Sequence, residues 1–83
     1  MDERYIVIGR MSCPFCMAAK ELLEQKEINS IILDYDKDLG ILEDYKNFHK
    51  QNTVPIILHN DLISGRVTKV GGYTELLERI GSV

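Results

Sequence analysis

The sequence predicts an α/β fold in which three helices flank a four-stranded mixed sheet, in the order β-α-β-α-β-β-α. Three observations support this fold class. Strand-length runs rich in β-branched residues alternate with helical patterns in the first half of the chain. Two further runs then follow each other through a turn-rich segment, and a last helical pattern comes after them. The first β-α-β unit should form a right-handed crossover, and the later pair of strands should form a hairpin.

The first strand and the first helix are expected on either side of a short turn. The run "RYIVIG", Arg4 to Gly9, has the composition of a buried strand that Gly9 ends. Pro14 suits the first turn of a helix, which we expect to extend to about Glu27. The residues with helical spacing on its inward face are Ala19, Leu22, Leu23 and Lys26, the last contributing its aliphatic stem.

A second strand is expected over "SIILDYD", Ser30 to Asp36. Asp38 can then cap a second helix, which should end near Asn52. Ile41, Tyr45 and Phe48 share one face of this helix, and the pattern predicts that they pack against the rest of the molecule.

The last part of the sequence predicts a hairpin followed by a helix. The segments "TVPIIL" and "RVTKV" are expected to be the third and fourth strands, joined through "HNDLISG" with Gly65 as a turn residue. The segment "GGYTELLERIGSV" is expected to form the closing helix. The long hairpin could contact a partner or be an ordinary surface loop.

Length and composition narrow the classes of function. With 83 residues the chain is expected to form one small domain over residues 1–83. The ten basic residues are scattered and the net charge is −3, so we expect neither nucleic acid nor a membrane as partner. The N-terminus lacks the pattern of an export signal, and two cysteines are too few for a secreted disulfide scaffold. These features favour a cytoplasmic monomer.

Both cysteines of the chain lie in the stretch "GRMSCPFCMAAKELLEQ", three residues apart. They could form a structural disulfide, half of a metal site or a redox pair. Structural zinc usually takes four ligands, and only His49 and His59 remain as further candidates, so no metal is expected. A disulfide over so short a loop would stabilise weakly. Two inert buried thiols stay possible, but they would not explain Pro14 at the helix start.

The position of Cys13 just before a helix favours the redox pair. Unpaired N–H groups and the positive end of the helix dipole stabilise a thiolate there, and Arg10 adds positive charge. Cys16, about one turn into the helix, is expected to be more buried but close enough to form a disulfide. Pro14 stiffens the turn, and Phe15 should provide an apolar wall beside the sulfurs.

Three separated motifs give the sequence its resemblance to a known family. "CPFC" follows the first strand, "TVP" opens the third, and "GGYTEL" precedes the last helix; in this order and spacing they resemble a glutaredoxin. The resemblance implies a thioredoxin-like fold with a cis peptide bond before Pro55. It also implies that the backbone of Val54 pairs with an extended peptide, as an added strand does.

Glutathione is the peptide that the resemblance implies. Arg10, with Gln51 and Thr53 as weaker candidates, would bind its glycine carboxylate, and the helix start at Tyr73 and Thr74 would bind its γ-glutamyl carboxylate. Glu75 stands where the family usually has an Asp that contacts the γ-glutamyl amine. The full set of expected contacts is Arg10, Phe15, Gln51, Thr53, Val54, Pro55, Gly72, Tyr73, Thr74 and Glu75.

The expected activity is that of a dithiol glutaredoxin, which reduces protein disulfides and glutathione mixed disulfides. Cys13 would attack and Cys16 would resolve the mixed disulfide. One alternative is a redoxin that donates electrons to a specific enzyme such as ribonucleotide reductase and is recharged by a reductase. Another is a dimeric carrier of a glutathione-bridged iron–sulfur cluster, which Pro14 disfavours because it would crowd the cluster.

Overall fold

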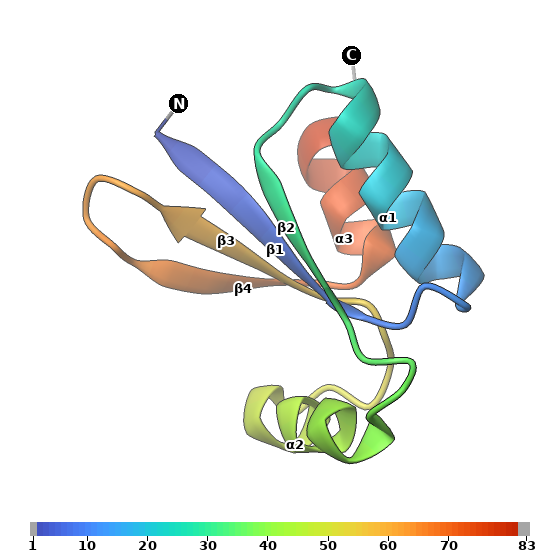
Figure 1. The fold of residues 1–83 in the computed structure, drawn as a ribbon. Coiled ribbons are helices and arrows are strands. Elements are labelled where there is room, and N and C mark those ends of the chain that lie inside the picture. Colours follow the sequence, from blue (N-terminus) through green and yellow to red (C-terminus); the bar gives the residue numbers. More distant parts are fainter. Residues whose placement is uncertain (1, 82–83) are drawn as a thin grey trace.

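The computed structural model describes residues 2–81 and confirms the predicted α/β fold. Its strands form one mixed sheet in the order β2-β1-β3-β4, in which β1 is parallel to β2 and antiparallel to β3, and β3 is antiparallel to β4. Figure 1 shows α1 and α3 on one face of the sheet and α2 on the other. The elements are β1 (Glu3–Gly9), α1 (Pro14–Gln25), β2 (Ser30–Asp34), α2 (Leu39–His49), β3 (Ile56–Asp61), β4 (Val67–Gly71), α3 (Tyr73–Leu76) and the π-helical segment η1 (Leu77–Gly81).

Two apolar clusters cover the two faces of the sheet, because neighbouring residues of a strand point to opposite faces. Along β1, Val7 belongs to the cluster under α1 and α3, and Ile8 belongs to the cluster under α2. The first cluster contains the buried residues Tyr5, Val7, Ala19, Leu23, Ile57 and Leu76. The second contains Ile8, Leu42, Ile56 and Leu58. The central strands β1 and β3 are therefore covered on both sides.

Helix α1 has the predicted start and a slightly earlier end. Cys13 is its N-cap residue and Pro14 follows in the first turn. Its inward face holds Ala19 and Leu23, as the spacing predicted. The helix ends at Gln25 rather than near Glu27, because Glu27 has a φ of 55°, in the left-handed region. Lys26 is consequently exposed and does not bury its stem.

Helix α2 differs from the prediction in the face that it buries. Asp38 caps it as expected, accepting a hydrogen bond from the backbone N–H of Ile41 at 3.3 Å. The helix ends at His49 rather than near Asn52, since Lys50 adopts a left-handed conformation with a φ of 55°. Leu42 is its buried residue, whereas Phe48 is 79% and Ile41 39% exposed, so the expectation that these two side chains pack inward was wrong. Within residues 2–81 no other helix or strand lies over the outer side of α2, so Phe48 faces solvent (Figure 1).

The remaining boundaries also shift by a few residues. Strand β2 ends at Asp34, two residues before the predicted end, and β3 begins at Ile56, directly after a cis Val54–Pro55 peptide bond. Gly65 turns the hairpin with a φ of 80°. The closing helix changes from α to π geometry after Leu76, and its predicted last two positions, 82 and 83, lie outside the described residues. None of the helices within residues 2–81 has the length and apolarity needed to cross a membrane.

Candidate functional site

The two cysteines differ sharply in exposure. Cys13 is half-buried at the N-cap of α1, whereas Cys16 is 0% exposed, and both are free thiols. The backbone N–H of Arg10 donates to the sulfur of Cys16 at 3.5 Å. Cys13 precedes the helix, so its side chain meets the N–H groups that have no partner inside the helix. Cys16 lies one turn further on, and its side chain enters the protein interior.

The surroundings shift the two thiol pKa values in opposite directions. Partial burial by itself would raise the pKa of Cys13, but the nearby backbone N–H groups of Cys16 and Phe15 favour the thiolate and lower it. The thiol of Cys16 and the charge of Arg10 act in the same direction, so the pKa of Cys13 lies below its ordinary value. Burial raises the pKa of Cys16 to about 11. Cys13 is therefore the better thiolate and Cys16 stays protonated at neutral pH.

Gly9 is a residue of this site that the sequence analysis treated only as the end of a strand. A Cβ atom on Gly9 would lie 2.5 Å from the sulfur of Cys16 and 3.6 Å from the Cα atom of Pro55. The missing side chain thus lets the end of β1 pass between the buried sulfur and the proline. The only sequence signal was a glycine in an otherwise β-branched strand, which often marks a close approach of the backbone.

Two acidic residues that the sequence analysis did not single out hold the loop before Cys13. Asp36 accepts hydrogen bonds from Arg10 Nε at 3.0 Å, from the backbone N–H of Ser12 at 2.9 Å and from the Ser12 hydroxyl at 2.7 Å. Asp34 accepts from the backbone N–H of Met11 at 3.2 Å. The last residue of β2 and the segment directly after it therefore fix the loop that leads into the helix.

Across from the cysteines, the segment before β3 forms the second side of the site. Its Val54–Pro55 peptide bond is cis, as the resemblance implied. Gln51 donates from Nε2 to the carbonyl oxygens of Thr53 at 3.0 Å and of Pro55 at 2.9 Å. No hydrogen bond within residues 2–81 uses the N–H or C=O group of Val54. An extended peptide can therefore pair with this backbone.

A hollow of about 250 Å³ brings together eight of the ten residues expected to contact glutathione. The rings of Phe15 and Tyr73 lie on it with their centroids 6.0 Å apart. Its lining residues are Phe15, Thr53, Val54, Pro55, Gly72, Tyr73, Thr74 and Glu75.

Three of the polar side chains expected to bind the ligand are engaged within the chain. Arg10 and Gln51 do not line the hollow: Arg10 is paired with Asp36, and Gln51 is bonded to the loop around Pro55. Glu75 lines it, but its carboxylate accepts the backbone N–H of Gly72 at 2.7 Å. Glu75 therefore caps its own helix, which the sequence alone did not indicate.

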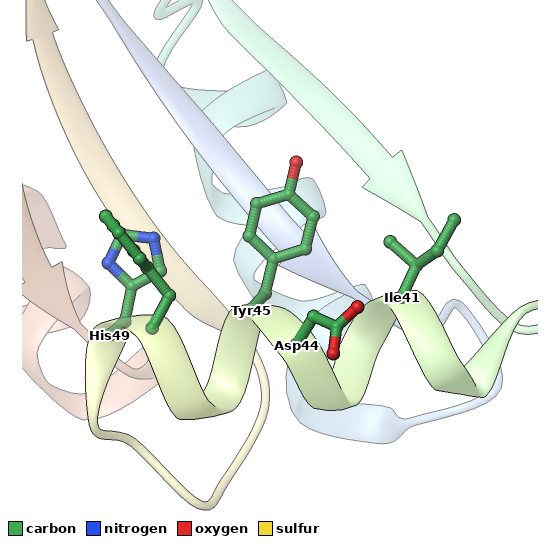
Figure 2. Close-up of a pocket in the computed structure, with 5 residues that line it drawn as sticks. Ile41, Asp44, Tyr45 and His49 are labelled. Atoms are coloured by element: carbon green, nitrogen blue, oxygen red, sulfur yellow. The ribbon is translucent and has the colours of Figure 1, made fainter.

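A larger hollow of about 510 Å³ lies on α2 and contains neither cysteine. Figure 2 shows Ile41, Asp44, Tyr45 and His49 around it, and Phe48 completes the lining. Its walls offer no thiol, and α2 lies on the other face of the sheet from α1 (Figure 1). Among residues 2–81, no group of three or more His, Cys, Asp or Glu side chains could hold a metal ion. We therefore place the functional site at the cysteines.

Comparison with known families agrees with this placement. The family model described as Glutaredoxin matches residues 6–63, which include both cysteines and Pro55. The chain belongs to the glutaredoxin family. None of the curated proteins compared with the chain matches it.

Three solved structures are similar to this glutaredoxin-family chain. The buckwheat glutaredoxin–glutathione complex has a TM-score of 0.72 and 21% identity, over 93% of this chain and 67% of that one. Glutaredoxin 1 from Francisella tularensis, complexed with cacodylate, has a TM-score of 0.63 and 24% identity, over 95% of this chain and 93% of that one. The glutaredoxin-like NrdH-redoxin from Escherichia coli is described as having a thioredoxin-like activity profile. It has a TM-score of 0.66 and 17% identity, over 96% of this chain and 97% of that one. At these identities the likeness shows a shared thioredoxin-like fold.

Family membership and the cysteine pair together assign the chemistry at a coarse level. The chain is a thiol–disulfide oxidoreductase of the glutaredoxin family. Such chemistry needs one accessible sulfur of low pKa and a second sulfur nearby. The half-buried Cys13 at the N-cap of α1 has the lowered pKa, and Cys16 lies one turn further on.

Proposed function

We propose that this chain is a dithiol glutaredoxin that uses glutathione to reduce protein disulfides and glutathione mixed disulfides. The observation that carries the proposal is the contrast between the two thiols. Cys13 is accessible and has a lowered pKa, whereas burial raises the pKa of Cys16 to about 11. This contrast supports Cys13 as the nucleophile and Cys16 as the resolver.

In the forward reaction the Cys13 thiolate attacks one sulfur of the substrate disulfide. A bond forms between Cys13 Sγ and that sulfur, and the other substrate sulfur leaves as a thiolate and takes up a proton. Cys16 then loses its proton and attacks Cys13 Sγ, releasing the second substrate thiol. The substrate gains two electrons and two protons, and the chain is left with a Cys13–Cys16 disulfide.

Two glutathione molecules would return the chain to the dithiol form. The first attacks Cys13 Sγ, which frees Cys16 and leaves a glutathione mixed disulfide on Cys13. The second attacks the glutathione sulfur, so that glutathione disulfide leaves and Cys13 is reduced. The hollow beside Phe15 and Tyr73 is the proposed glutathione site, with the Val54 backbone pairing to the tripeptide.

We also propose the setting in which this chemistry operates. Residues 1–83 would act as one domain and as a monomer in the cytoplasm, where thiols are kept reduced. The expected partners are glutathione and proteins that carry disulfides or glutathionylated cysteines, and neither nucleic acid nor a membrane. The proposed recognition uses the Val54 backbone, and the proposed chemistry uses the two thiols. The proposal therefore includes no metal.

A second candidate function is a redoxin that serves one enzyme, such as ribonucleotide reductase, and is recharged by a reductase instead of glutathione. The observation in its favour is that the side chains of Gln51 and Glu75 are bonded to the Pro55 loop and to Gly72 respectively. Side chains engaged in this way offer fewer polar groups to a charged tripeptide.

A turnover assay separates the two candidates. The chain is supplied with a small glutathione mixed disulfide, glutathione, glutathione reductase and NADPH, and NADPH consumption is followed. The glutaredoxin proposal predicts turnover that saturates with glutathione and needs Cys13. If glutathione gives no turnover but a thioredoxin-type reductase with NADPH reduces the Cys13–Cys16 disulfide, the second candidate is correct.

A further inference from the structure

We propose that Asp36 is a positioning residue of the active site, which holds the guanidinium of Arg10 so that its terminal nitrogens face an anionic group approaching Cys13. The proposal concerns the loop from Gly9 to Ser12 and its bonds to the end of β2. It rests on Cys13 being the attacking cysteine, as in the proposed function, but it does not depend on glutathione being the reductant.

The carboxylate of Asp36 bonds to both Arg10 and Ser12. Oδ1 accepts Arg10 Nε at 3.0 Å and the Ser12 hydroxyl at 2.7 Å, and Oδ2 accepts the Ser12 backbone N–H at 2.9 Å. One side chain thus fixes both a cation and the backbone directly before the nucleophile. Ser12 contributes through its hydroxyl and its N–H group, so the loop cannot turn without breaking several bonds.

The ion pair uses the inner nitrogen of Arg10. Within residues 2–81 no hydrogen bond involves its two terminal nitrogens, and the side chain is 42% exposed. A guanidinium can bind a carboxylate through its terminal nitrogens while Nε is occupied, because its five N–H donors point in fixed directions. Asp36 therefore orients Arg10 and leaves its binding edge available.

Arg10 is close enough to the nucleophile for this orientation to matter. The backbone N–H of Cys13 donates to the carbonyl oxygen of Arg10 at 3.0 Å, so a tight turn joins the two residues. The positive charge of Arg10 also contributes to the lowered pKa of Cys13. The Ser12 hydroxyl and then Arg10 hold the pKa of Asp36 below its ordinary value, so Asp36 stays ionised wherever Cys13 reacts.

Two possible roles of Asp36, cancelling the charge of Arg10 and positioning its guanidinium, predict opposite effects of a neutral replacement. If Asp36 only cancelled the charge of Arg10, replacing it by a neutral residue would make the surroundings of Cys13 more positive, and an anion would approach faster. If Asp36 positions Arg10, the same replacement removes one acceptor oxygen and the charge of the ion pair, so the guanidinium is held less firmly and an anion loses its directed partner.

The test compares two alkylating reagents of similar size, iodoacetate, which is anionic, and iodoacetamide, which is neutral. Both react with the Cys13 thiolate, so the ratio of their rate constants cancels any change in the pKa of Cys13. At low ionic strength we expect Asp36→Asn to lower this ratio about three-fold or more. A ratio that rises or stays unchanged would overturn the positioning role.

Two further variants make the outcome specific. Asp38→Asn removes the same charge two residues away but keeps a good N-cap for α2, and Asp38 makes no bond to the loop before Cys13. We expect this variant to leave the ratio unchanged or slightly raised. In an Arg10→Gln background, Asp36→Asn should no longer lower the ratio, because the two residues act as one unit.

Mass spectrometry identifies the alkylated cysteine in every variant. Alkylation at Cys13 with a rising ratio overturns the role of Asp36 alone and leaves the proposed function in place. Alkylation at Cys16 in the unmodified chain would overturn both, since Cys13 would then not be the reactive thiol.

Discussion

At the scale of single residues, a separation of one helical turn makes the two cysteines chemically different. Cys13 at the N-cap faces unpaired N–H groups, and Cys16 has lost all contact with solvent. The helix dipole favours an anion at the first position, and desolvation opposes one at the second. The proposed order of the reaction, attack by Cys13 and then resolution by Cys16, rests on this difference.

Arg10 should support the thiolate and attract anionic substrates. Replacing it by Glu should raise the pKa of Cys13 and increase the KM for glutathione several-fold, with a larger deficit at low salt, where the screening length is greater. Thiolate absorbance followed against pH and kinetics at two ionic strengths measure both effects. Arg66→Glu in the hairpin is the matched charge reversal, and its values should stay near those of the unmodified chain. An Arg10→Glu chain with an unchanged KM at both salt concentrations would remove Arg10 from the site.

At the scale of elements, the site forms where the end of β1, the start of α1 and the segment before β3 meet. Motif spacing predicted this meeting, because "CPFC" follows one strand and "TVP" opens another. The sequence could not show that Asp34 and Asp36 bond to the loop before Cys13, since that contact depends on where β2 ends. It also could not show that Glu75 bonds back to Gly72, because the same carboxylate could face a ligand.

Pro55 should matter more for activity than for folding. It is fully buried, and its Cα atom lies near Gly9 beside the sulfur of Cys16. Pro55→Ala should lower turnover ten-fold or more, while the loss in free energy of unfolding stays near ~1–2 kcal/mol, the range of a small core truncation. Steady-state kinetics and urea unfolding of the same preparation provide the comparison. A loss of activity no larger than the unfolded fraction explains would mean that Pro55 has only a structural role.

Gly9 should tolerate no side chain. A Cβ atom 2.5 Å from Cys16 Sγ forces the strand or the helix to move, and overpacking of this kind costs roughly 1–3 kcal/mol. Gly40→Ala in α2 is the control, because its Cβ would meet Asp38 Oδ1 at an ordinary 3.7 Å. The free energy of unfolding of this control should rise by up to about 1 kcal/mol, since Ala has a higher helix propensity than Gly. The urea midpoint should therefore fall for Gly9→Ala and rise for Gly40→Ala. Equal shifts of the two midpoints would refute the steric role of Gly9.

At the scale of the whole molecule, the sheet order and the covering of both faces follow from the alternation of helices and strands. Alternating residues in β1 and β3 fill two clusters, so the class of fold could be predicted from periodicity and the crossover rule. The exposure of the outer side of α2 could not be predicted in this way. Helical spacing groups Ile41, Tyr45 and Phe48 correctly on one side, but it does not tell whether another element covers that side.

The raised pKa of Cys16 should make the stability of the reduced chain depend on alkaline pH. Burial raises this pKa to about 11 from an ordinary 9.0, so between these values the folded chain keeps a proton that the unfolded chain has lost. The contribution of this proton to the free energy of unfolding is at most about 2–3 kcal/mol. It is fully present below pH 9 and is lost as the pH rises toward 11.

Urea unfolding at pH 8 and at pH 10.5 measures this loss. Two chains are compared in a Cys13→Ser background, one with Cys16 and one with Cys16→Ala, so that a single thiol titrates. The chain with Cys16 should lose more stability between the two pH values. The same loss in both chains would show that Cys16 is not the group responsible.

The central claim is that Cys13 attacks and Cys16 resolves, and selective alkylation tests it most directly. The reduced chain is treated with a small neutral alkylating agent near pH 6 and the modified cysteine is identified by mass spectrometry. We predict that Cys13 is labelled first. We also predict that Cys16→Ser keeps removal of glutathione from mixed disulfides but loses reduction of protein disulfides, and that Cys13→Ser loses both. Labelling of Cys16 first, or turnover by Cys13→Ser, would contradict the assignment of nucleophile and resolver.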